Sequence, residues 1–193
     1  RDFREQGIEP MALLSLLARL GSSDPVKLRS SLEDLAEHFD PARFGSAPTK
    51  FDQADLLPLT ARVLHERPFE DVADEIANLG VPSDMAPAFW EVMRANVTTM
   101  ADLAPWWEIC RDGADPMIAE EDADFVREAM GLLPDAPYSK DTWSTWTSAV
   151  KDATGRKGKG LFMPLRLAVT GQARGPDMGD LMPLMQVVRA RNL

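Results

Sequence analysis

The sequence predicts an all-α fold of many short helices, arranged as a multi-helix bundle or cage with two helical subdomains. Apolar residues recur along nearly the whole chain at the three- and four-residue spacing of one helix face. Turns rich in Pro, Gly and Asp separate these segments. No stretch combines period-two alternation with the β-branched and aromatic residues of a strand, so no sheet is expected.

The first two predicted helices lie close to the N-terminus. One occupies residues 11–20 after Pro10, and Gly21 ends it because glycine readily takes the left-handed conformation found just past a helix. Ser30 or Ser31 caps the next helix through its hydroxyl group. The apolar residues of this second helix, which we expect to face inward, are Leu32, Leu35, Ala36 and Phe39.

Three further helices are predicted in the middle of the chain. They occupy residues 55–64, 69–79 and 87–96. Pro68 opens the second of them, since proline is tolerated in the first turn of a helix, and Gly80 ends it. Ser83 or Asp84 caps the third.

Five helices are predicted in the C-terminal half. Thr98 or Thr99 caps the first of them, which runs to Cys110, and Ser139 caps the helix that carries two tryptophans. Gly131 closes the helix between these two. The last two helices are predicted over residues 160–169 and 176–188.

Composition places the chain among globular proteins rather than membrane proteins. Of its 193 residues, 45% are hydrophobic and 27% are charged. No apolar run approaches the roughly 20 residues that span a bilayer, and the charged start does not resemble a signal peptide. The first residue is Arg rather than Met, so we expect a piece of a longer protein. A single cysteine, Cys110, cannot form an internal disulfide, which fits the cytoplasm.

Charge is strongly polarised along the chain. The total is -10, which by itself argues against a nucleic-acid partner. Residues 151–193, however, hold eight Lys and Arg against three Asp, a net charge of +5 that leaves -15 for residues 1–150. The C-terminal segment is therefore the part of the chain where a polyanion is expected to bind, although chance clustering on a solvated surface is the alternative.

Residue patterns that would indicate catalysis are missing from the sequence. His38, His65 and Cys110 do not form a zinc motif, and the Glu and Asp runs lack the spacing of a calcium loop. The glycine-rich residues 155–160 have the spacing of a phosphate-binding loop, but Leu161 follows where that loop needs Lys. We therefore predict no catalytic residue, no metal site and no cofactor in this chain.

The C-terminal segment carries the most specific motif. Residues 157–171 read KGKGLFMPLRLAVTG, and an Arg-Gly-Pro loop follows at residues 174–176. This order resembles a signature of bacterial glutamyl-tRNA synthetases, in which a short Pro-Leu-Arg helix precedes a Gly-Pro or Thr-Pro loop and a final helix. Supporting matches, in the family's order, lie at residues 7–21, 51–65 and 91–100.

The resemblance implies a domain plan and a function. Residues 1–66 would be a stem-contact-like region and residues 67–193 an anticodon-binding region, with a sub-boundary near residues 133–137. The family attaches glutamate to tRNA with ATP. Its catalytic domain, which binds ATP, Mg and glutamate, would precede Arg1, so this chain should bind tRNA but not activate glutamate. The implied partner is a glutamate-accepting tRNA, with a glutamine-type tRNA left open, and the implied state is a monomer.

The resemblance also implies which residues touch RNA. The anticodon contacts would be Arg166, Gly175, Pro176, Met178 and Asn96, and the backbone contacts would be Arg156, Lys157, Lys159 and Arg174. The chemistry agrees, because a guanidinium forks onto a base edge or phosphate, glycine permits close approach, and methionine can pack on a splayed base. A structural salt bridge is the alternative role for Arg166.

Asn96 departs from the family pattern. Some members carry an Arg here that senses the last anticodon base, whereas Asn offers hydrogen bonds without charge. Strict discrimination between glutamate and glutamine anticodons is therefore an open question for this chain.

Two other functions fit parts of the sequence. The acidic residues 1–150 also suit a stand-alone α-helical module that binds protein. A small helical enzyme with a hidden metal is a third possibility, which metal analysis of the purified chain would test.

Overall fold

The structure, a computed structural model, describes residues 2–46 and 49–192. Helices and short 3-10 turns make up its regular structure, and the β pairing in the described residues is one isolated bridge between Ser22 and Phe44. The prediction of an all-α fold is confirmed. The chain divides into two compact units: unit 1 comprises Arg1–Val72 and Val97–Leu103, and unit 2 comprises Ala73–Asn96 and Ala104–Leu193.

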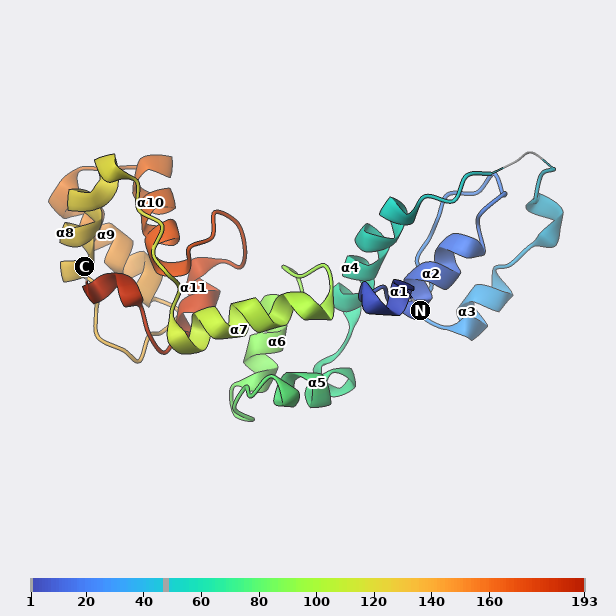
Figure 1. The fold of residues 1–193 in the computed structure, drawn as a ribbon, viewed down its shortest axis with the longest axis horizontal. Coiled ribbons are helices and arrows are strands. Elements are labelled where there is room, and N and C mark those ends of the chain that lie inside the picture. The colour runs from blue at the N-terminus through green and yellow to red at the C-terminus, as the bar shows by residue number, and fades with distance from the viewer. Residues whose placement is uncertain (1, 47–48, 193) are drawn as a thin grey trace. The chain divides into compact units, whose positions relative to one another are not determined.

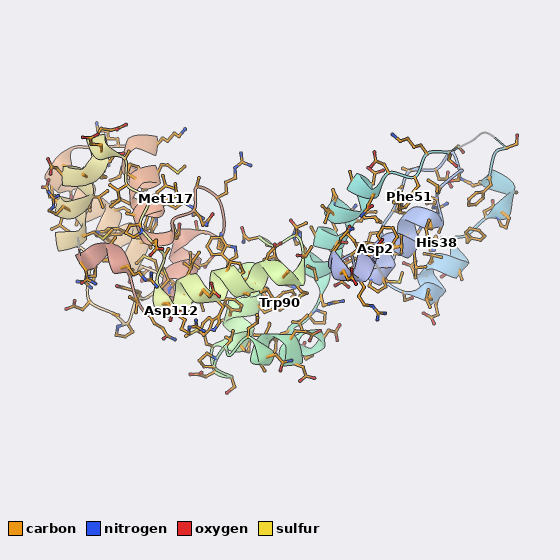
Figure 2. The ribbon with its side chains drawn as sticks, in the orientation of Figure 1. Asp2, His38, Phe51, Trp90, Asp112 and Met117 are labelled. Carbon is orange, nitrogen blue, oxygen red and sulfur yellow. The ribbon has the colours of Figure 1, made fainter. Side chains whose placement is uncertain are left out.

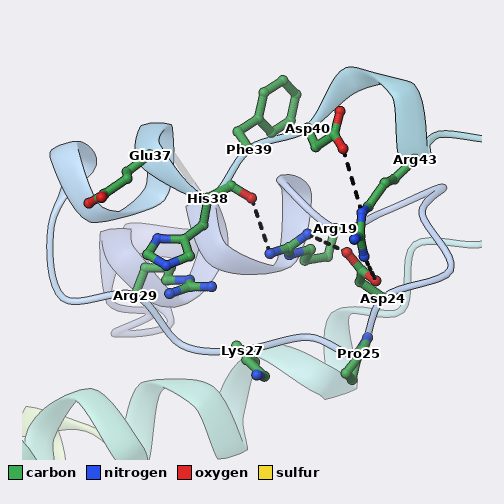
Figure 3. A pocket seen from close by; sticks show the side chains of 10 residues that line it. All are labelled: Arg19, Asp24, Pro25, Lys27, Arg29, Glu37, His38, Phe39, Asp40 and Arg43. Atoms are coloured by element: carbon green, nitrogen blue, oxygen red, sulfur yellow. Dashed lines mark hydrogen bonds and ion pairs between the residues drawn. The ribbon is translucent and has the colours of Figure 1, made fainter.

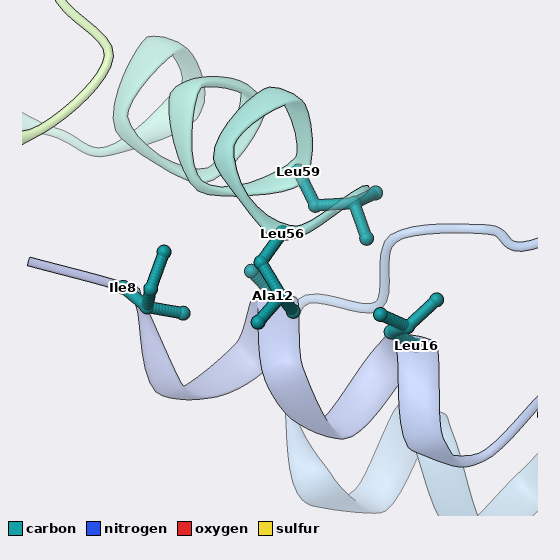
Figure 4. Packing of buried hydrophobic residues seen from close by; sticks show 5 residues of the cluster. All are labelled: Ile8, Ala12, Leu16, Leu56 and Leu59. Carbon is teal, nitrogen blue, oxygen red and sulfur yellow. The ribbon is translucent and has the colours of Figure 1, made fainter. Parts of the chain in front are cut away.

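Unit 1 is built on two helices that pack against each other, α2 (Pro10–Leu17) and α4 (Leu56–Glu66). Pro10 stands in the first turn of α2, where its missing N–H has no helical partner to lose. The buried side chains of this core are Ile8, Ala12, Leu16, Leu56 and Leu59 (Figure 4). Ala12 and Leu16, four positions apart on one face of α2, supply half of this core together with Ile8, which precedes the helix.

The remaining elements of unit 1 are short. They are α1 (Asp2–Glu5), α3 (Leu32–Glu37) and the 3-10 turns η1 (Pro41–Arg43), η2 (Gln53–Asp55), η3 (Phe69–Asp71) and η4 (Met100–Asp102). Ser31 caps α3 as predicted, accepting a hydrogen bond from the Asp34 N–H at 3.1 Å. The expected inward face of α3 is wrong: Leu32 is 59% and Phe39 is 46% exposed. The helix has only six residues and buries none of them.

Unit 2 contains most of the helices. These are α5 (Ala73–Asn78), α6 (Ala86–Met93), α7 (Leu103–Asp112, whose first residue belongs to unit 1), α8 (Ala123–Gly131), α9 (Thr142–Thr154), α10 (Lys159–Thr170) and α11 (Met178–Leu181). The 3-10 turns are η5 (Glu120–Asp122), η6 (Met182–Leu184) and η7 (Arg189–Asn192). Helices α8, α9 and α10 pack against one another (Figure 1).

Aromatic side chains fill the core of unit 2. Trp90, labelled in Figure 2, and Phe89 lie fully buried on α6. Trp146 of α9 is also buried, and its indole N–H donates to the Ala129 carbonyl at 2.8 Å. A buried indole N–H needs such a partner, so this bond fixes α9 against α8.

Several predicted helix starts differ from the structure. Neither Ser83 nor Asp84 caps α6, which begins at Ala86 without a side-chain cap. Ser139 does not cap α9 either; instead its backbone N–H donates to the Thr142 hydroxyl at 2.8 Å. The single helix expected over residues 69–79 is two elements, η3 and α5, because the backbone leaves the helical region at Val72, where φ is -126°.

The predicted helix over residues 176–188 is also wrong. Only α11 and the turn η6 are helical there, and the backbone becomes extended at Met185. Pro183 has no N–H to continue the helical ladder. Beyond it, the Gln186 N–H donates to the Cys110 carbonyl at 2.7 Å, so this backbone is tied to α7 instead of to its own turn.

The proline-rich residues 133–137, the predicted sub-boundary, lie inside unit 2. Arg191 of η7 holds this stretch, donating to the carbonyls of Leu133 and Pro134 at 2.9 Å and pairing with Asp135 at 2.9 Å. The C-terminal turn is thus fastened to the segment that follows α8.

Candidate nucleic-acid interface

The site begins with the loop of residues 171–177, which joins α10 to α11 and is called here the 171–177 loop. Helix α10 ends at Gly171, whose φ of +64° suits glycine. At that end of the loop, the Thr170 hydroxyl accepts from the Gln172 N–H at 3.0 Å. At the other end, Asp177 caps α11 by accepting from the Gly179 N–H at 2.8 Å. Side chains therefore hold both ends, while residues 172–175 are exposed.

Arg166 lies on α10 beneath this loop. Its Nη1 donates to the Pro176 carbonyl at 2.9 Å. Its Nε and Nη2 are buried and have no hydrogen-bond partner among the described residues. Burial lowers the pKa of Arg166, and the nearby Asp177 carboxylate opposes that change. The predicted alternative of a salt bridge is replaced by a hydrogen bond to the loop backbone.

Gly175 touches the aromatic ring of Trp106, on α7. A Cβ built on Gly175 would overlap the Trp106 ring and lie 2.9 Å from Nη2 of Arg166. The φ of Gly175 is +143°, a conformation that other residues rarely adopt. Both the space and the backbone conformation therefore require glycine at this position.

A hollow of about 470 Å³ lies beside the loop within unit 2. Its lining residues include Asn96, which follows α6, and Pro176 from the loop, although they are far apart in the sequence. The Asn96 amide donates to the Val92 carbonyl at 3.0 Å, which leaves its oxygen as an acceptor. The volume falls within the range of about 300–1,000 Å³ that is usual for small-molecule sites.

Carboxylates surround the same hollow. Glu91, Asp177 and Asp180 line it, and Lys140 lies 3.7 Å from Asp180. A carboxylate accepts hydrogen bonds but repels phosphate, so these walls suit the donor groups of a base better than the backbone of a nucleic acid.

The predicted contacts differ in how they are placed. Met178 is only 4% exposed and belongs to the core, so its side chain is not available at the surface to pack on a base. Arg156 pairs with Asp122, donates to the Gly160 carbonyl at 3.3 Å, and lies 3.9 Å from the centre of the Phe125 ring. Its guanidinium is therefore engaged inside unit 2.

The three other basic residues are free to meet a ligand. Lys157, Lys159 and Arg174 are exposed, and none of them forms an ion pair with another residue in the described ranges. Lys157 precedes the first turn of α10 and Lys159 begins it, whereas Arg174 lies in the 171–177 loop. Positive charge that is not neutralised by the protein is available to phosphate.

Unit 1 has a hollow of its own, of about 370 Å³ (Figure 3). Arg19 and Arg43 both bind Asp24, at 2.9 and 2.7 Å, and Arg29 binds Asp34 at 3.2 Å. Each of these guanidinium groups is already paired with a carboxylate. The cluster thus ties the loops of unit 1 together, and its guanidinium charges are already neutralised.

Within residues 2–46 and 49–192, no group of three or more His, Cys, Asp or Glu is arranged to hold a metal ion. No helix within 2–46 and 49–192 has both the length and the apolar character that crossing a membrane requires.

Trp106, Asp177, Asp180 and Lys140 were not among the predicted site residues. The adjacent pair Trp106 and Trp107 did carry a signal, because two neighbouring residues on a helix cannot both face the core. Trp107 is the buried member, at 2% exposure, which leaves Trp106 to meet the loop. Nothing in the sequence marked the two aspartates or the lysine.

Comparison with known proteins gives a consistent result. Residues 34–189 match the family described as an anticodon binding domain. The chain is 64% identical over 191 residues to glutamate–tRNA ligase 1 of Ruegeria pomeroyi and 67% identical over 187 residues to glutamate–tRNA ligase 2 of Jannaschia sp.. These alignments cover 99% and 97% of this chain but only 43% and 42% of the relatives.

Solved structures share the fold. A glutamate tRNA ligase from Elizabethkingia meningosepticum, crystallised in complex with its amino acid, matches 94% of this chain with a TM-score of 0.71 and 21% identity. The matched region is 39% of that protein. The helical architecture is therefore shared at a low level of sequence identity.

Proposed function

The chain belongs to the anticodon-binding domain family, and from this premise we propose that it is the tRNA-reading module of a glutamate–tRNA ligase. The proposal is supported most directly by the hollow of unit 2, which both Asn96 and Pro176 line. Single-stranded RNA is read by splaying a base into such a pocket and contacting its edge. The anticodon loop is the single-stranded part of tRNA that this pocket would take.

We assign recognition of the anticodon base to groups around the hollow of unit 2. The Asn96 oxygen and the Gly175–Pro176 backbone would contact the base, and Arg166 belongs to the same site through its hydrogen bond to the Pro176 carbonyl. Met178 supports the loop from the core. The carboxylates on the walls favour a base that presents an amino group.

Phosphate binding is assigned to the exposed cations of the basic segment. Lys157, Lys159 and Arg174 would contact the RNA backbone on either side of α10. Because their charges have no carboxylate partner in the described ranges, each should add to the salt dependence of binding. Residues 1–66 would add stem contacts, as the family resemblance implies.

The parent enzyme would join glutamate to tRNA with ATP and Mg, all bound in a part that lies outside this chain. We place it in the cytoplasm as a monomer, with a glutamate-accepting tRNA as its partner. The chain alone should then show no glutamate-dependent exchange of pyrophosphate into ATP.

The direct test is titration of the chain with labelled glutamate-accepting tRNA at two salt concentrations. We expect binding that weakens steeply with salt and exceeds the binding of a tRNA with an unrelated anticodon. No binding, or equal binding of both tRNAs, would overturn the proposal.

A further inference from the structure

We propose that Trp106 and Arg166 are positioning residues, which together hold the 171–177 loop in the shape that reads RNA. The inference rests on the proposed function. It adds Trp106 to the site, a residue that belongs to none of the sequence motifs from which the RNA contacts were predicted. Neither side chain needs to touch RNA in this role.

Arg166 holds the loop through its backbone. The guanidinium nitrogen Nη1 donates to the Pro176 carbonyl at 2.9 Å, and the other two nitrogens, Nε and Nη2, are buried. A guanidinium that contacts phosphate needs at least one nitrogen at the surface. In this conformation the described contacts join Arg166 to the site through Pro176, a residue that lines the hollow.

Trp106 holds the adjacent residue. The missing side chain of Gly175 lets the loop backbone lie directly against the indole ring, in space that a Cβ would have to share with that ring. The same missing Cβ would lie 2.9 Å from Nη2 of Arg166. The Trp106 indole and the Arg166 guanidinium therefore both lie against Gly175. Substitution of either residue should shift the backbone at Gly175.

This contact matters because the loop has little other support in its middle. The Thr170 hydroxyl and the Asp177 cap fasten its ends, whereas residues 172–175 are exposed. A loop that is already ordered loses less conformational entropy when a ligand binds. Without Trp106 or Arg166, the Gly175–Pro176 backbone should sample other positions, and the hollow should lose its selectivity.

The experiment measures affinity for glutamate-accepting tRNA and for the same tRNA with one changed anticodon base, in Trp106→Ala, Arg166→Ala and the double variant. Each single variant should reduce discrimination about tenfold, the effect of one misplaced base contact. The double variant should lose little more than either single variant, because both act on one backbone segment. The dependence of affinity on salt should stay as in the unchanged chain, since no phosphate contact is lost.

Two control variants separate positioning from general stability. Trp143→Ala removes another partly buried indole of unit 2, one that contacts Trp146 and Phe162, and should lower the melting temperature without changing discrimination. Lys157→Ala should flatten the salt dependence without changing discrimination. If an alanine variant does not fold, Trp106→Phe and Arg166→Lys replace it, and both should keep part of the discrimination.

The outcomes are distinct. Failure of the unchanged chain to bind tRNA would overturn the proposed function itself. Binding with discrimination that survives Trp106→Ala would overturn the role of Trp106 alone. A flatter salt dependence in Arg166→Ala would make Arg166 a phosphate contact, and additive losses in the double variant would make the two residues independent. Either of these results contradicts the proposed coupling.

Discussion

Arg156 and Lys157 are neighbours in the sequence, and the structure gives them opposite roles. Arg156 is engaged by the Asp122 carboxylate, the Gly160 carbonyl and the face of the Phe125 ring. Lys157 is exposed and has no ion pair in the described ranges. We therefore expect Arg156→Ala to change stability, and Lys157→Ala to change RNA binding.

The magnitudes follow from these contacts. Side chains in the Arg156–Asp122 pair are 33% and 20% exposed, so the pair is only partly screened. A pair of this kind and a cation–π contact together contribute about 1–2 kcal/mol. In a chain of this size that loss lowers the melting temperature by about 2–8 °C. Loss of one phosphate contact at Lys157 instead lowers the slope of log affinity against log salt by about 0.7–0.9.

Thermal unfolding and tRNA titration on the same two variants provide the assay. Between about 50 and about 200 mM salt, the affinity of Lys157→Ala should fall about threefold less than that of the unchanged chain. Arg156→Ala should keep the original slope and melt earlier. A flatter salt dependence in Arg156→Ala with unchanged melting would refute the assignment of Arg156 to the fold.

Three further predictions concern single residues. Gly175→Ala should abolish anticodon discrimination, since a Cβ would overlap the Trp106 ring; discrimination equal to that of the unchanged chain in binding assays would contradict this. Asn96→Arg in the full-length ligase should raise the preference for glutamate-type over glutamine-type anticodons, measured as a ratio of charging efficiencies, because it adds a charged fork at the hollow. Burial raises the pKa of the Cys110 thiol to about 12, so thiol reagents should label it at about pH 8 only after unfolding, and rapid labelling of the folded chain would show that it is accessible.

Much of the helical pattern follows from local sequence. The helices α9 and α10 were both predicted. In the structure Gly155 and Gly171 follow their last residues, and both adopt positive φ values. The final helix was not, because its length depends on Pro183 and on a hydrogen bond from Gln186 to a distant helix. Periodicity records which residues can face a core, but not whether another element will cover them, which is why Phe39 of unit 1 was placed wrongly.

The candidate site was predictable only in part. The motif around Arg166 and the Arg-Gly-Pro loop pointed to residues that the structure brings together, and Asn96 joins Pro176 at the same hollow. Proximity of Trp106 to Gly175 arises from the packing of α7 beside the loop and leaves no trace in residue spacing. Their roles in RNA binding stay predictions.

The central claim is that unit 2 reads the anticodon, and one binding measurement tests it most directly. The chain is titrated at fixed salt with the anticodon stem-loop of a glutamate-accepting tRNA and with the same stem-loop carrying a different middle anticodon base. A changed base should weaken binding by about 1–3 kcal/mol, which is roughly 5- to 150-fold. Equal affinity for the two stem-loops would show that the chain binds RNA through charge alone, and would contradict the claim.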